Sequence, residues 1–186
     1  KDNNKLFCEG KSQPNLELNG ERSDLNWLLT SNFLPKNVLY NCKDQNDENR
    51  LNNYGINTTN NFQYKKKFIN NLSKKNKYKS KIFDKKIDNL IIHKHFFDYK
   101  YNFNKWFNYF SNHNVKVFLS WYKYDSLHIP MHDAINELGG ISTFFQPNFD
   151  GISYYESKLF TDINFCNSQF SVSIDKKNLS KIDNQI

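Results

Sequence analysis

A strand-like run, a polar loop and an amphipathic segment follow one another between Val115 and Gln146. Val115–Ser120 (VKVFLS) is apolar and rich in β-branched residues, which is typical of a buried strand. From residue 127 on, apolar side chains recur at a spacing that places them on one face of a helix: Leu127, Met131, Ala134, Ile135 and Leu138. The helix is expected to end at Gly139 and Gly140, before a second apolar run (ISTFF). This order predicts the strand–helix–strand unit of a parallel sheet.

The rest of the chain repeats this alternation less regularly. Short strands are predicted at Lys5–Cys8, Leu16–Leu18, Asn37–Tyr40, from Ile56, and at Asp162–Asn167. Helices are predicted after the cap at Ser23 and Asp24, from Asp47 to Gly55, in the Lys-rich stretch Phe62–Phe83, and over Asp84–Asn112. The tail from Asp175 to Ile186 is polar and is expected to add no element to the sheet.

The recurring order of strand, helix and strand predicts an α/β fold of the Rossmann-like kind, with a doubly wound, mostly parallel sheet and flanking helices. The 186 residues are expected to form one such domain, with residues 60–86 as a Lys-rich insertion and 175–186 as a polar tail. The number of predicted strands is low, so we expect the chain to be a fragment or one lobe of something larger.

Charge is concentrated in one part of the chain. The formal net charge is +7, and ten lysines lie between Lys65 and Lys86. Such a block favours a polyanion, either nucleic acid or an anionic membrane surface, although a solvated linker between helices has the same composition. No apolar run is long enough to span a membrane, and the three cysteines form no CxxC pair, so a cytoplasmic protein without a disulfide framework or structural zinc site is expected.

The start of the helix after residue 126 carries the reactive side chains. Asp125 or Ser126 is expected to cap it, and Pro130 suits a first turn whose amides have no helical partner. His128, His132 and Asn136 fall on one strip that borders the apolar face, whereas Asp133 and Glu137 are expected to point toward water. Because ligands of parallel sheets bind at the carboxyl ends of the strands, this strip predicts a crevice from Tyr122 to His132.

Three interpretations of the strip remain open. In the first, His128 or His132 is a general base for a hydroxyl group, and the amino end of the helix attracts an anionic group. In the second, Asp125 and the two histidines bind a metal ion, although the extra glutamate of the helical zinc motif is missing. In the third, the histidines are hydrogen-bonded boundary residues and Asp125 is only a cap. Neither GxGxxG nor GxxxxGK[ST] occurs, which argues against an ordinary dinucleotide or P-loop site.

The segment SWYKYDSLHIPMHDAINELGGIS, followed by FQPNFDGISYYES and TDINFCNS, resembles the amino-terminal half of bacterial surface-polysaccharide biosynthesis proteins related to GT-B-fold glycosyltransferases. SDLNWLLTSNFLPKNVLY and NDENRLNNYGI are similar in kind. The resemblance implies two Rossmann-like lobes that face each other across a cleft. The nucleotide-sugar donor would bind mainly to the carboxyl lobe, and a glycan or lipid-linked acceptor mainly to the amino lobe, with no further cofactor and no metal.

Within that resemblance, Asp125, His128 and His132 would line the acceptor side, and one of them would take the proton from the attacking sugar hydroxyl. Lys123 would help to hold a pyrophosphate-linked acceptor, and Tyr122, Tyr124, Ser126 and Asn136 would complete the acceptor site. A second lobe is missing, so the chain alone is not expected to turn over. Lipid-linked acceptors sit at the inner membrane face, where Lys65–Lys86 would attract anionic lipid.

Two other functional classes compete with this hypothesis. The second is a basic, aromatic-rich α/β module that binds nucleic acid, because Tyr and Phe side chains can stack on bases. Against it, the aromatic residues between Ile87 and Phe110 have the helical spacing of a core. The third is a metal-dependent hydrolase.

Overall fold

A computed structural model describes residues 5–8, 31–42, 45–60, 86–120, 127–145 and 158–186 of the chain. Its centre is a seven-stranded sheet in which every pair of neighbours is parallel. The strands are β1 (Lys5–Cys8), β2 (Val38–Cys42), β3 (Asn57–Asn60), β4 (Val115–Ser120), β5 (Ile141–Phe145), β6 (Phe160–Phe165) and β7 (Lys181–Gln185). The described helices are η1 (Pro35–Asn37), α2 (Gln45–Asn53), α4 (Lys86–Asn112), α5 (His128–Glu137) and α6 (Gln169–Lys177).

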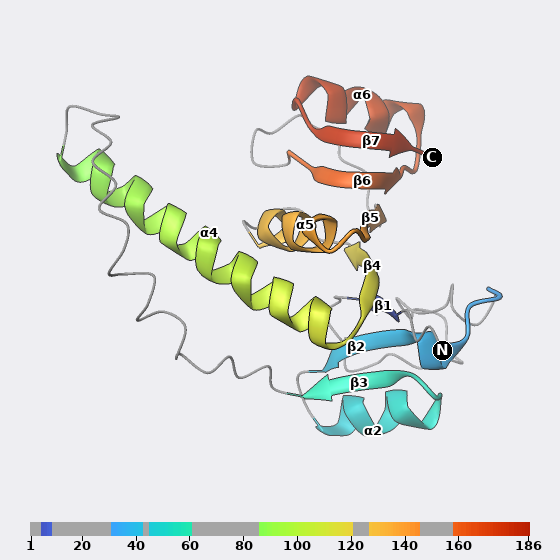
Figure 1. Cartoon of the computed structure of the whole chain (residues 1–186). Helices are drawn as coiled ribbons and strands as arrows, with labels where there is room; N and C mark the ends of the chain where they lie inside the picture. The colour runs from blue at the N-terminus through green and yellow to red at the C-terminus, as the bar shows by residue number, and fades with distance from the viewer. Residues whose placement is uncertain (1–4, 9–30, 43–44, 61–85, 121–126, 146–157) are drawn as a thin grey trace.

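The spatial order of the strands is β3-β2-β1-β4-β5-β6-β7. The chain therefore builds outward from β1 to β3, returns through α4 to the other side of β1, and continues outward from β4 to β7. The sheet is strongly twisted, so that the arrow of β3 points left in Figure 1 while that of β7 points right. This order confirms the prediction of a Rossmann-like, doubly wound α/β fold.

Alternation along β2 shows how the sheet separates two cores. Val38, Tyr40 and Cys42 face one side and pack with Leu51 of α2, whereas Leu39 faces the other side. The second core is formed by α4, α5 and the neighbouring strands: Leu39, Trp106, Tyr109, Phe110, Val115, Phe118, Met131, Ala134 and Ile135. Helices therefore cover both faces, as a parallel sheet requires.

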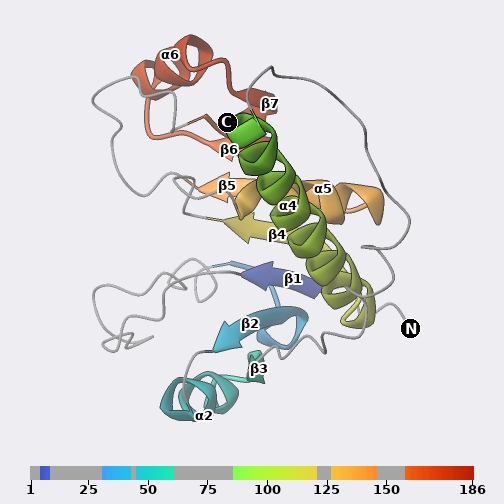
Figure 2. The same ribbon diagram turned by 90° about the vertical axis from the view of Figure 1, so that its left-hand side faces the viewer.

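Helix α4 packs across one face of the sheet and contacts both of its halves. It crosses one face of the strands in Figure 2, and its Tyr109 hydroxyl lies 2.6 Å from the Thr59 hydroxyl of β3. Its aromatic stripe is buried where it meets the sheet, because Trp106, Tyr109 and Phe110 are at most 4% exposed. The interpretation of this stripe as core is confirmed for those residues. In contrast, the first turns extend past the sheet and expose Leu90, Ile91 and Phe97 (Figure 1).

The prediction that residues 175–186 add nothing to the sheet was wrong. Helix α6 covers residues 169–177, and β7 pairs with β6 as the last strand of the sheet. A buried carboxylate holds this unit together, since Asn164 of β6 donates a hydrogen bond of 2.9 Å to Asp175 of α6. The sequence concealed the strand because an edge strand needs only one half-buried apolar residue, here Ile182.

Other boundaries also differ from the predicted ones. The strand predicted at Asp162–Asn167 runs from Phe160 to Phe165, and the helix predicted from Asp47 begins at Gln45. The long helical segment is one helix that starts at Lys86. The elements predicted at Leu16–Leu18, after Ser23 and Asp24, and at Phe62–Phe83 lie outside the described residues. None of the described helices is long and apolar enough to cross a membrane.

Candidate functional site

The strand order reverses between β1 and β4, which are neighbours in the sheet although α2, α4 and two strands separate them in the chain. In sheets of this kind, ligands bind outside the carboxyl ends of the strands at the reversal. Residues 121–126 follow the carboxyl end of β4, so the predicted site residues Tyr122, Lys123, Tyr124, Asp125 and Ser126 lie outside the described residues. The structure places the other three: His128, His132 and Asn136.

Helix α5 begins at His128 with Leu127 as its N-cap residue. Asp125 and Ser126, which were predicted to cap the helix, lie outside the described residues. Pro130 lies in the first turn, as predicted, and it is buried.

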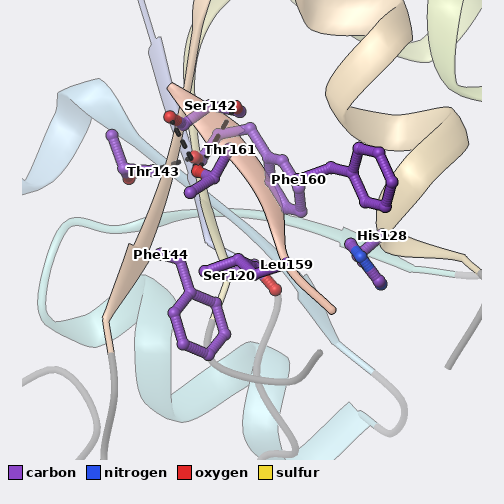
Figure 3. Close-up of a pocket in the computed structure, with 9 residues that line it drawn as sticks. Ser120, His128, Ser142, Thr143, Phe144, Leu159, Phe160 and Thr161 are labelled. Atoms are coloured by element: carbon purple, nitrogen blue, oxygen red, sulfur yellow. Dashed lines mark hydrogen bonds between the residues drawn. The ribbon is translucent and has the colours of Figure 1, made fainter. Parts of the chain in front are cut away.

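His128 is more buried than its place on a boundary strip suggested, since only 7% of it is exposed. The centre of its ring lies 6.3 Å from the centre of the Phe160 ring on β6 (Figure 3). The ammonium groups of Lys158 and Lys181 lie 5.4 and 5.8 Å from the centre of the same Phe160 ring. His128 and Ser120, the last residue of β4, line one cavity, so the first turn of α5 lies beside the carboxyl end of that strand.

The cavity is small and contains several hydroxyl groups. Ser120, Ser142, Thr143 and Thr161 all line it, and the Thr161 hydroxyl donates to the backbone oxygen of Ser142 (Figure 3). Its volume of about 10 Å³ leaves room for about one water molecule. The cavity itself therefore holds no substrate, and a ligand would have to lie further out, beyond the strand ends.

His132 faces a different set of partners. Its Nδ1 lies 2.6 Å from the Ser142 hydroxyl, and its Nε2 lies 3.4 Å from the side-chain nitrogen of Asn136. Asp162 connects the group, because its carboxylate accepts from the Ser142 hydroxyl (2.9 Å), the Ser142 amide (2.6 Å) and Asn136 (3.1 Å). We call these four residues, His132, Asn136, Ser142 and Asp162, the α5–β6 network.

The α5–β6 network favours one tautomer of the neutral imidazole. The Ser142 hydroxyl gives its only proton to Asp162, so it can only accept from His132. A neutral His132 therefore carries its proton on Nδ1 and offers the Nε2 lone pair to Asn136. Ser142 stands between the histidine and the carboxylate, and it is 2% exposed, so the three residues do not have the order of a nucleophilic triad.

The two histidines contact different residues. His132 is bonded to Ser142, the second residue of β5, whereas His128 lies beside Phe160, the first residue of β6, and lines the small cavity together with Ser120. Among the described residues, no three His, Cys, Asp or Glu side chains are placed to bind a metal ion together.

The helical spacing predicted that Asp133 points toward water, and this prediction was wrong. Its carboxylate accepts a hydrogen bond of 2.5 Å from the hydroxyl of Tyr99, which reaches it from α4. Burial raises the pKa of Tyr99 above its ordinary value of 10, and the hydrogen bond and negative charge of Asp133 raise it further. Asp133 is therefore part of the contact between α4 and α5 and not of the crevice.

Sequence reasoning missed Ser142 and Asp162. Both are polar residues within strands, and both face α5, where the alternation of a buried strand leads one to expect apolar residues. That departure from the pattern was the available signal.

No model of a protein family, no curated protein sequence and no solved structure matches this chain.

Proposed function

We propose that the chain is the acceptor-side lobe of a nucleotide-sugar-dependent glycosyltransferase that acts in cell-surface polysaccharide biosynthesis. The observation that supports it most is the reversal of strand order between β1 and β4, because the helix after β4 begins with a histidine beside the strand end. A Rossmann-like sheet with its reversal there is what an acceptor lobe of this kind needs, and the resemblance of residues 120–142 supports the class.

In the proposed reaction, a base removes the proton of an acceptor hydroxyl as its oxygen attacks the anomeric carbon of the donor sugar. The bond from that carbon to the nucleoside diphosphate breaks, and the diphosphate leaves with the bonding electrons. We assign the base to His128 or Asp125, because the ring of His132 is engaged by Ser142 and Asn136. His132 then acts as a positioning residue of α5. Lys123 binds the diphosphate of a lipid-linked acceptor.

A binding experiment tests this assignment without requiring turnover. The ¹⁵N-labelled chain is titrated with a water-soluble alkyl-diphosphate-linked monosaccharide, and amide shifts are followed. The expected shifts cluster at the carboxyl end of β4 and in the first turn of α5, and His128→Gln reduces the affinity more than His132→Gln. Shifts confined to other elements, or equal affinity in His128→Gln and the unaltered chain, would contradict the proposal.

Contact with an anionic membrane is the second part of the proposal. The first turns of α4 expose Leu90 (61%) and Phe97 (50%), and they follow the block Lys65–Lys86 in the chain. Apolar side chains next to clustered lysines suit the interface of an anionic bilayer, where each lysine adds about 1 kcal/mol of attraction. A lobe held there would meet lipid-linked acceptors, and the protein would be cytoplasmic and peripheral.

Co-sedimentation with phosphatidylcholine vesicles, with and without phosphatidylglycerol, measures this contact. The double variant Leu90→Ser and Phe97→Ser is expected to sediment less with the anionic vesicles. Leu179→Ser, which changes an equally exposed leucine after α6, is the matched control and is expected to sediment like the unaltered chain. Equal binding to neutral vesicles would contradict the electrostatic part of the proposal.

A further inference from the structure

A second hollow lies where β1, β2 and β3 begin, at the amino ends of the strands. The predicted crevice lies at their carboxyl ends. The volume of the second hollow is about 240 Å³, and it is lined by Lys5, Lys36, Asn37 and Asn57. We call it the amino-edge hollow. None of its four lining residues belongs to the candidate site at the carboxyl end of β4, so the two are separate sites.

The backbone around the amino-edge hollow is fixed by hydrogen bonds. Lys5 is the first residue of β1, and its amide donates to the backbone oxygen of Asn114 (3.1 Å). Lys36 and Asn37 belong to η1, which leads into β2, and the side chain of Asn57 at the start of β3 donates to the backbone oxygen of Lys36. Three neighbouring strands therefore carry the lining residues to one place.

The charge in the amino-edge hollow is positive. Two lysines and two asparagines line it, and none of these four residues is acidic. The imidazole of His113, which lies between α4 and β4, is also close by. Burial lowers the pKa of His113, and the charge of Lys5 lowers it further. Two lysines on a backbone fixed by hydrogen bonds, with no acid among the four described lining residues, favour the binding of an anion.

We propose that the amino-edge hollow binds a small phosphate-bearing anion of about the size of pyrophosphate. Lys5 and Lys36 supply charge, and the side-chain amides of Asn37 and Asn57 supply neutral polar contacts. The volume lies below the roughly 300–1,000 Å³ of pockets for drug-sized ligands, which favours a phosphate group over a whole nucleotide.

Isothermal titration with inorganic pyrophosphate at low ionic strength tests the proposal. The double variant Lys5→Gln and Lys36→Gln is expected to bind at least about tenfold more weakly, because two charge-assisted contacts are lost. The control Lys176→Gln and Lys177→Gln removes the same charge from the last turn of α6, at the other end of the sheet. Equal weakening in both double variants would show attraction to net charge alone and would overturn the site, as would the absence of binding.

The imidazole of His113 gives an independent readout. Bound pyrophosphate is expected to raise the pKa of His113 in an NMR titration, because its negative charge offsets that of Lys5. A pKa of His113 that stays unchanged at saturating pyrophosphate would place the anion elsewhere and overturn the proposal. A short DNA duplex is the second probe. Binding of the duplex alone, weakened only by the Lys5 and Lys36 variant, would replace the small anion with nucleic acid.

This proposal and the glycosyltransferase proposal fail independently. The acceptor titration reports on α5 and the end of β4, whereas the pyrophosphate titration reports on Lys5, Lys36 and His113 at the opposite edge.

Discussion

His132 Nδ1 and the Ser142 hydroxyl oxygen lie 2.6 Å apart, and Asp162 receives the proton of that hydroxyl. We therefore expect a neutral His132 to populate the Nδ1–H tautomer, although Nε2–H is the commoner form in free imidazoles. Long-range ¹H–¹⁵N correlation spectra at a pH above the titration of the ring distinguish the two tautomers. A predominant Nε2–H signal would contradict the described hydrogen bonds.

Ser142→Ala is expected to lower the free energy of unfolding by about 1–3 kcal/mol. The change removes the buried hydroxyl that bonds to the His132 ring and to the Asp162 carboxylate, and it leaves the Asp162 amide without that acceptor, a loss that costs about that much. Urea unfolding followed by circular dichroism measures the loss. Ser173→Ala, which removes a single contact to the oxygen of Phe170 on α6, is the control and should cost less than about 0.5 kcal/mol. Equal losses would show that the α5–β6 network adds nothing.

The Tyr99–Asp133 hydrogen bond should make stability depend on pH in the alkaline range. Above pH 10 the unfolded phenol ionises while folded Tyr99 keeps its proton, because its pKa is raised. The unfolded state then binds fewer protons, so the free energy of unfolding falls as the pH rises. Tyr99→Phe should reduce this slope from about pH 10 upward, compared with Tyr101→Phe on the same helix. Parallel curves for the two variants would rule out this contribution.

Gly139 and Gly140 end α5 for different physical reasons. Gly139 has a φ of +67° and open space around a hypothetical Cβ, whereas a Cβ on Gly140 would lie 2.7 Å from the backbone oxygen of Lys116. Gly139→Asn should therefore cost little, since asparagine tolerates that conformation. Gly140→Ala should lower the free energy of unfolding by about 1–3 kcal/mol through overpacking against β4. Chemical unfolding of both variants provides the comparison, and a larger loss for Gly139→Asn would contradict it.

Leu179 offers a stabilising change. It follows α6, has a φ of 57° and is 69% exposed. The left-handed backbone conformation is therefore unfavourable for this leucine, and little packing of the side chain offsets the cost. Leu179→Gly should raise the free energy of unfolding by about 1 kcal/mol, because glycine adopts this conformation without the Cβ clash. Leu179→Ala keeps the Cβ and should not give this gain. The midpoint of thermal unfolding reports both, and a lower midpoint for Leu179→Gly would contradict the prediction.

The periodicity of the sequence was sufficient to predict the fold class. Val115–Ser120 and the strip around Met131 and Ala134 carry strong patterns because both faces of a parallel strand and one face of a helix are buried. Edge elements were harder to predict. β7 contains one half-buried apolar residue, and its stability depends on pairing with β6 and on the buried Asp175, neither of which leaves a local signal.

The candidate site could be predicted only in part. The strand order that brings β4 next to β1 determines where the crevice lies, and a single sequence does not reveal strand order. Helical spacing placed His128 and His132 on one strip of the helix. It could not show that Ser142 bonds to His132 and is itself bonded to Asp162. Those partners are polar residues of other strands, and their contacts depend on register.

The central position of β1 has a consequence for how the chain acquires its structure. Lys5 pairs with Val115, about 110 positions further along the chain, while the opposite edge of β1 is occupied by β2. During synthesis, β1 to β3 are therefore made long before β4 can cover the open edge of β1. Such distant pairing slows folding and leaves an unpaired strand edge exposed meanwhile. Helix α4, made just before β4, packs Trp106, Tyr109 and Phe110 in one core with Leu39, and we expect its docking there to bring β4 beside β1.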